Sequence, residues 1–137
     1  MADTIRSVDY YQTTVHDEPA AAYHLLARLA DAGVNLLGFN AIPVGMHATQ
    51  LVLFPADGDL LRRVVESLGL AATGPHRALL VQGDDQLGVL AEIHRRLLEV
   101  GVHPYAASGL TDGRGGFAVV VHLRGDQVES ATRALGL

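Results

Sequence analysis

Two adjacent carboxylates, Asp84 and Asp85, are the residues of this sequence that most resemble a pair for general acid and base chemistry. Neighbouring side chains near a turn usually point apart and are solvated, so the pair alone does not predict catalysis. No nucleophile lies beside a partnered base, and no serine lies in a G-x-S-x-G segment. We therefore expect no catalytic residue and no enzymatic activity. The alternative, a small enzyme, would have to use His103 or this aspartate pair.

The histidines of the chain do not have the spacing of a metal site. No two of them stand four residues apart, and they form no other compact ligand set: His16, His24, His47, His76, His94, His103 and His122. The chain has no cysteine, which excludes disulfides and thiolate ligands. The glycine-rich segment 113–116 stands between two expected strands, where a hairpin turn is expected rather than a phosphate loop. We expect neither a metal nor a cofactor.

The charge distribution excludes the usual nucleic-acid binders. The net charge is −5, and the basic residues are all arginines that are scattered from Arg6 to Arg133 without a cluster. Apolar residues make up 49% of the chain, enough for a packed core, but no apolar run is long enough to cross a bilayer. The first residues do not resemble an export signal. We expect a cytoplasmic protein that does not bind membranes.

The sequence repeats itself with an offset of 68 residues. At this offset, identical residues align without a gap and in the same order: Asp17 with Asp85, Arg28-Leu29 with Arg96-Leu97, Gly33-Val34 with Gly101-Val102, Gly45 with Gly113, and Val52 with Val120. The order of these matches predicts two copies of one structural unit. We expect the first domain at 8–74 and the second at 75–137.

Each copy reads as strand, helix, strand, strand, helix. In the second copy the first helix is predicted from an apolar face formed by Leu90, Ile93, Leu97 and Val100. This helix should end at Gly101, and Glu92 and Arg96 should pair on its outer face. The matching helix of the first copy should end at Gly33. The second helix of each copy is predicted from a similar apolar face, which consists of Leu60, Leu61, Val64, Val65 and Leu68 in the first copy and of Val128, Ala131 and Leu135 in the second. Strands are expected within 10–15, 34–44, 49–54, 78–82, 102–110 and 117–123.

This order is the ferredoxin-like arrangement, in which helices cover one face of an antiparallel sheet. The fold class is therefore α+β, with two βαββαβ repeats. The final strand of each repeat is weak, because only 71–73 suggests one in the first copy and the second copy ends at Leu137 before one can form. An open sheet edge is normally covered. We expect the N-terminal segment or a partner subunit to fill the vacant edge.

The turn and first helix of each copy share a motif. In the second copy it reads Asp-Gln-Leu-Gly at 85–88 and ends in Val-Gly-Val-His at 100–103; in the first it reads Asp-Glu-Pro-Ala at 17–20 and ends in Ala-Gly-Val-Asn at 32–35. This pattern resembles the ACT domain, where an acidic residue and Pro-Gly open a leucine-rich helix that ends in Gly-Val/Ile-Asn. The resemblance implies a regulatory amino-acid site at the turn, the helix start and the residue after Gly-Val. The residues implied are Asp17, Pro19, Ala20, Asn35, Asp85, Leu87, Gly88 and His103.

The two copies depart from the ACT pattern in different ways. Ala20 replaces the glycine that permits close approach of a ligand, while Leu87 and His103 replace the proline and the asparagine. Asp17 and Asp85 also suit helix N-caps, a role that is compatible with ligand contact.

The resemblance implies a non-catalytic regulatory protein of tandem ACT type. It would bind a small molecule, in particular an amino acid, and form a homodimer that acts on a regulated partner or on its own assembly. The alternative is a protein–protein assembly module that keeps the ACT fold and has lost ligand binding.

Overall fold

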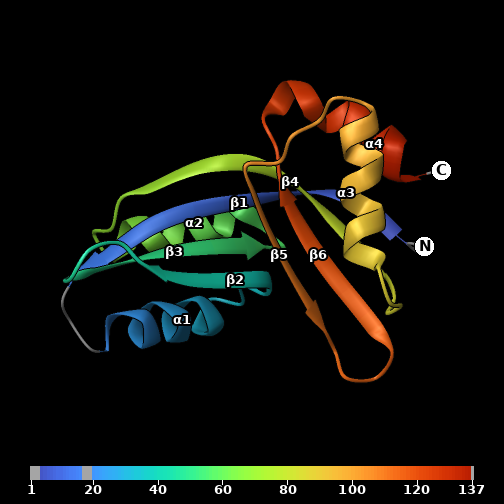
Figure 1. Ribbon diagram of the computed structural model, residues 1–137. Coiled ribbons are helices and arrows are strands. Elements are labelled where there is room, and N and C mark those ends of the chain that lie inside the picture. The colour runs from blue at the N-terminus through green and yellow to red at the C-terminus, as the bar shows by residue number, and fades with distance from the viewer. Residues whose placement is uncertain (1–3, 17–19, 137) are drawn as a thin grey trace. The chain divides into compact units, whose positions relative to one another are not determined.

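The computed structural model describes residues 4–16 and 20–136, which form an α+β protein, as the sequence predicts (Figure 1). None of the described helices is long and apolar enough to cross a membrane. In chain order the elements are β1 (Thr4–His16), α1 (Ala21–Asp31), β2 (Leu36–Pro43), β3 (Ala48–Pro55), α2 (Gly58–Ser67), β4 (Ala72–Asp84), α3 (Val89–Glu99), β5 (Ala106–Thr111), β6 (Gly116–His122), a short 3-10 turn (Gly125–Gln127) and α4 (Val128–Gly136).

The chain divides into two compact units, the first of which spans 9–76. Its strands follow the order β2-β3-β1-β4. Strand β3 runs antiparallel to both neighbours, with Leu53 opposite Tyr11 and Phe39. Alternate residues of β1 and β3 pack against α1 and α2, which cover one face of these strands. The core of this unit consists of Tyr11, Val15, Leu25, Leu29, Val34, Leu51, Leu53, Leu61, Val64 and Val65.

The second unit combines 77–136 with residues 4–8 of β1. Its strands follow the order β5-β6-β4-β1, and β6 runs antiparallel to β4 and β5. Helices α3 and α4 pack against each other and against one face of these strands (Figure 1). Most of its core consists of Leu79, Val81, Val89, Ile93, Leu97, Phe117, Val119, Val121, Val128, Ala131 and Leu135.

The N-terminal segment lies where the second copy of the sequence has no strand of its own. Strand β1 is the neighbour of β4, and Ile5 packs against the core that α3 and α4 cover. Val8, at the end of this segment, is buried. Within this unit, residues 4–8 therefore take the place of a final strand after α4.

Strand β4 is longer than the sequence predicts. Residues 72–73 of the first expected strand and the whole of 78–82 are parts of one continuous strand that passes through Gly74 and Pro75. This dipeptide is usual in turns, but here it lies inside the strand. In the 9–76 unit the Arg62 guanidinium donates a hydrogen bond of 2.8 Å to the Gly74 carbonyl oxygen and lies 5.5 Å from the centre of the Tyr11 ring. Contacts from α2 and β1 thus hold the strand at the dipeptide.

The first helices end where the sequence predicts. Gly33 and Gly101 adopt positive φ angles of 83° and 73°, which glycine tolerates. The next N–H group then turns back into the helix: Val34 donates to the Leu29 carbonyl oxygen at 2.8 Å, and Val102 to that of Leu97 at 2.9 Å. Both are Schellman-type helix ends.

The predicted apolar face of α3 is partly wrong. Ile93 and Leu97 are buried, but Val89 is the third buried residue, while Leu90 and Val100 are half exposed. Residues at i, i+4 and i+8 share a face, so burial of Val89 turns Leu90 away from the core.

The predicted ion pair on α3 is confirmed, with 2.9 Å between Arg96 Nε and Glu92 Oε1. Hydrogen bonds from Arg95 and then from Arg96 lower the pKa of Glu92 to about 2. Because these side chains are solvated, we expect the pair to contribute little to stability.

The burial of His122 predicts that the stability of the second unit depends on pH. This residue of β6 is buried, it lies opposite Ala78 and Ala106, and burial lowers the pKa of its imidazole below the ordinary value of 6.5. Below about pH 6.5 the unfolded chain therefore binds a proton that the folded chain does not. We expect the free energy of unfolding to fall as the pH is lowered through this range.

The measurement is urea unfolding between about pH 7.5 and 5. The variant His122→Gln should show a flatter pH profile than the wild type, whereas the exposed His103→Gln should not. Equal slopes for wild type and His122→Gln would contradict this expectation.

Candidate functional site

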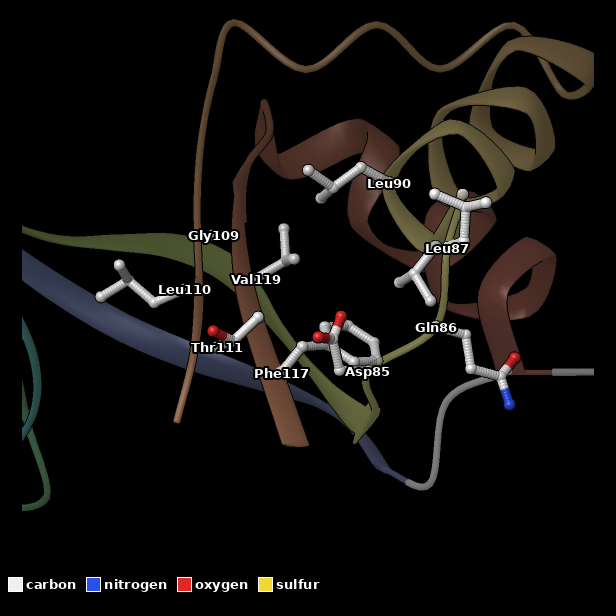
Figure 2. A pocket seen from close by; sticks show the side chains of 11 residues that line it. Asp85, Gln86, Leu87, Leu90, Gly109, Leu110, Thr111, Phe117 and Val119 are labelled. Carbon is white, nitrogen blue, oxygen red and sulfur yellow. The ribbon is translucent and has the colours of Figure 1, made fainter. Parts of the chain in front are cut away.

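A cavity of about 510 Å³ lies in the 77–136 unit, between the start of α3 and strands β5 and β6 (Figure 2). It combines the loop after β4 with the first turn of α3 on one side and the last residues of β5 on the other. The residues that line it are Asp85, Gln86, Leu87, Gly88, Val89, Leu90, Gly109, Leu110, Thr111, Phe117 and Val119.

The cavity exists because β5 presents little side-chain volume to the helix. Gly109 and Thr111 stand opposite Val119 and Phe117 of β6, so these four residues share the face that α3 covers. A Cβ atom at Gly109 would lie 3.1 Å from Val119 Cγ2 and 3.6 Å from Leu90 Cδ2. The missing side chain thus leaves open the space between the helix and the strand. Figure 2 shows Leu90 and Val119 on the two sides of this space.

The loop that precedes α3 is held by backbone hydrogen bonds. The Asp85 N–H donates to the Gly115 carbonyl oxygen at 2.7 Å, which ties the loop to the turn between β5 and β6. The Val89 N–H donates to the Gln86 carbonyl oxygen at 3.2 Å. Gly88 occupies the N-cap position with a φ of 86°, in the left-handed region. Glycine is favoured here because a side chain would strain this conformation.

The N-cap role expected for Asp85 is wrong. The N-cap position lies three residues later, at Gly88, and within the described part of the chain no side chain caps the first turn. The left-handed turn at Gly88 delays the start of the helix and leaves the Asp85 carboxylate beside the cavity. The Val89 N–H is bound to the Gln86 carbonyl oxygen, but without a side-chain cap the rest of the first turn directs partial positive charge outwards, which favours an anionic group at this position.

The surface of the cavity is mostly apolar. Phe117 and Val119 form a buried floor, and the exposed side chains of Leu87 and Leu90 lie at the opening, whereas the Leu110 side chain points to the other face of β5 (Figure 2). Among the lining residues, Asp85 alone carries a charge. The arrangement therefore offers one carboxylate, an uncapped helix start and an apolar wall.

The structure brings together three of the predicted site residues of the second copy. Asp85, Leu87 and Gly88 line the cavity, but His103 is exposed beyond the other end of α3. A helix of 11 residues separates Gly88 from His103, which is a length of about 16 Å. Within this unit His103 does not contribute to the cavity.

In the first copy, too, a helix separates two of the predicted site residues. Ala20 precedes α1, and Asn35 follows its end, where the Asn35 carbonyl oxygen accepts a hydrogen bond of 2.8 Å from the Ala56 N–H. The side chain of Asn35 is exposed. Asp17 and Pro19 lie outside the described residues.

The sequence interpretation missed the apolar part of the site. It pointed to the turn and the helix start, whereas much of the wall comes from Leu90 and from β5 and β6. One signal was available, because Gly109 stands inside an expected strand, where glycine often marks a close approach of another group. The other missed residues, Gln86, Leu110, Thr111, Phe117 and Val119, do not differ from ordinary strand and loop residues in the sequence.

The glycine-rich segment 113–116 is a hairpin turn, as predicted. The Asp112 N–H donates to the Gly116 carbonyl oxygen at 3.1 Å, and the Asp112 carboxylate accepts from the N–H groups of Arg114 at 2.6 Å and Gly116 at 3.0 Å. These backbone donors lower the pKa of Asp112. They are used within the turn, so they do not form a cradle for a phosphate.

No family model and no curated protein sequence matches the chain. Solved structures do. A protein from Bacteroides thetaiotaomicron superposes with a TM-score of 0.83 at 13% identity, over 96% of this chain and 88% of that one. The ligand-free regulatory subunit of aspartate kinase from Thermus thermophilus superposes with a TM-score of 0.70 at 15% identity, over 98% and 96%.

The regulatory subunit of aspartate kinase from Thermus flavus gives a TM-score of 0.62 at 15% identity, again over 98% of this chain and 96% of that one. At such identities the likeness shows the fold alone. This chain therefore shares its fold with these two regulatory subunits.

Proposed function

We propose that this chain is a non-catalytic regulatory protein of tandem ACT type, which binds an amino acid in the cavity at the start of α3. The observation that carries the proposal is the position of the cavity. It lies at the turn 85–88, where the sequence motif locates the ligand site of ACT domains. The likeness to regulatory subunits supports a regulatory rather than a catalytic role.

The chemistry of the cavity fits the polar groups of an amino acid. The uncapped first turn of α3 favours the ligand carboxylate, and the Asp85 carboxylate favours the ammonium group. Gly88 lets the ligand approach the backbone closely. The volume of about 510 Å³ lies within the range of roughly 300 to 1,000 Å³ that is common for small-molecule pockets.

The proposal assigns ligand contact first to Asp85, Leu87 and Gly88. The remaining predicted contacts are His103 and the first-copy residues Asp17, Pro19, Ala20 and Asn35. It also includes ACT-like domains at 8–74 and 75–137, a cytoplasmic homodimer, and a regulated partner protein that responds to the ligand. No metal or cofactor takes part.

A thermal-shift screen with the twenty amino acids at millimolar concentration tests ligand binding. Binding to the native state alone stabilises it by about 2.7 kcal/mol when the ligand concentration is a hundred times the Kd, so a bound amino acid should raise Tm by several degrees. Asp85→Asn keeps the shape of the side chain and removes its charge. This variant should reduce the shift, whereas Asp84→Asn, outside the cavity lining, should not.

The absence of a shift with every amino acid would contradict the proposal and favour an assembly module without a ligand. One observation supports that alternative. Leu87 is 108% exposed at the opening of the cavity and Leu110 is 81% exposed on the other face of β5, and exposed apolar side chains often contact another protein. An assembly module would bind its partner equally well with and without amino acids.

A further inference from the structure

We propose that the cavity selects an amino acid with an apolar side chain, and that Gly109 sets the upper limit on the size of that side chain. This inference rests on the proposed function, because it concerns the same site. It names the class of ligand and a specificity-determining residue that lies outside the sequence motif.

The preference for an apolar amino acid follows from the distribution of polar and apolar groups in the cavity. The polar contacts lie at the loop 85–88, where a ligand carboxylate and ammonium would bind. The other side of the cavity consists of Leu90, Phe117 and Val119, together with Gly109 and Thr111, while Leu110 borders it with its side chain directed to the other face of β5. Phe117 and Val119 are only 8% and 1% exposed, so a ligand side chain that rests on them leaves water.

Charged ligand side chains would find no partner on this wall. None of the cavity residues on β5 and β6 is charged, and Thr111 is the single residue there with a polar side chain. A charge moved from water to an apolar surface without a partner loses hydration that nothing replaces. Aspartate, glutamate and lysine should therefore bind more weakly than leucine, methionine or phenylalanine.

The position of Gly109 supports the second part of the inference, the limit on the size of the ligand side chain. It stands on β5 opposite Val119 and faces the same side, towards Leu90 of α3. A Cβ atom at this position would lie 3.1 Å from Val119 Cγ2, closer than ordinary van der Waals contact, and 3.6 Å from Leu90 Cδ2. Larger substituents would occupy the volume that we assign to the ligand side chain. Because Gly109 has no positive φ, a β-branched residue suits its extended backbone.

The experiment measures the binding of single amino acids to the full-length protein by titration calorimetry. The probes are L-leucine, L-methionine and L-phenylalanine as large apolar ligands, L-alanine as a small one, and L-aspartate and L-lysine as charged ones. The wild type should bind at least one large apolar probe about tenfold or more tightly than either charged probe. Gly109→Val should weaken that probe by about tenfold or more and change the affinity for L-alanine by less than about threefold.

Two further variants serve as a control outside the cavity and as a second change within it. Gly125→Val adds the same side chain at a glycine with open space around it, outside the cavity, and should leave all affinities unchanged. Leu90→Ala enlarges the cavity from the other side at a half-exposed position, which should preserve folding even if Gly109→Val does not. It should weaken the best apolar probe and favour L-phenylalanine over L-leucine relative to the wild type.

The failures of the inference and of the proposed function are distinguishable. Tight binding of L-aspartate or L-lysine would overturn the inference while the proposed function stands. The same holds if an apolar amino acid binds but neither Gly109→Val nor Leu90→Ala alters its affinity, because the ligand would then occupy another site. If no amino acid binds, the proposed function fails and the inference fails with it.

Discussion

Replacing Gly74 with alanine is expected to lower the free energy of unfolding by about 3 kcal/mol or more. Gly74 has a φ of +136°, which side-chain-bearing residues rarely adopt. A Cβ atom would also lie 2.8 Å from the Tyr10 carbonyl oxygen and 2.8 Å from Tyr11 Cδ2. Tyr10 and Tyr11 are 1% and 4% exposed, so neither can move aside without disturbing the interior of the 9–76 unit.

The control for Gly74→Ala is Gly69→Ala. Gly69 also has a positive φ, of 72°, but a Cβ atom there meets nothing within 4 Å. Its replacement should cost about 1 kcal/mol, the usual penalty for a left-handed alanine. Urea unfolding of both variants separates backbone strain from the steric clash. Equal losses for the two variants would contradict the clash with β1.

Leu97→Ala should destabilise the second unit by about 2 to 5 kcal/mol. Leu97 is 1% exposed and packs in the core that α3 and α4 form with the strands. Truncation removes apolar contacts and leaves a cavity that the surrounding core cannot fill. Helix α3 also bears the candidate site, so at mild denaturant concentration this variant should lose ligand binding together with its near-ultraviolet circular dichroism.

The adjacent residue provides a matched control. Leu98 lies on the same helix and is 65% exposed. Leu98→Ala makes the same chemical change and should alter the free energy of unfolding by no more than about 0.5 kcal/mol. Chemical unfolding of both variants, followed by circular dichroism, checks the difference. Similar decreases in the free energy of unfolding for the two variants would show that α3 does not direct Leu97, rather than Leu98, into the core.

Local signals explain why the secondary structure could be predicted from the sequence. Apolar spacing placed the helices, and Gly33 and Gly101 marked helix ends because few other residues tolerate the left-handed backbone. The turn around Asp112 could be predicted for the same reason, since its glycines and aspartate stabilise it without help from distant residues.

Predictions that depended on distant contacts were less accurate. Strands were expected separately at 71–73 and 78–82, but contacts of Gly74 with α2 and β1, through Arg62 and Tyr11, stabilise an extended chain between them. The predicted start of α3 was wrong by three residues, because Gly88 in its left-handed conformation, rather than Asp85, occupies the N-cap position. The apolar pattern alone did not distinguish Val89 from Leu90 as the buried residue.

The sequence by itself determined the order of the elements, the ends of the helices and the loop where the candidate site begins. These features follow from backbone preferences and side-chain periodicity, which act over a few residues. Only the tertiary structure decided that residues 4–8 join the second unit, that His103 lies about 16 Å of helix away from Gly88, and that Gly109 leaves space opposite Leu90. Such contacts depend on which strands pair, and pairing joins residues whose sequence separation carries no local signal.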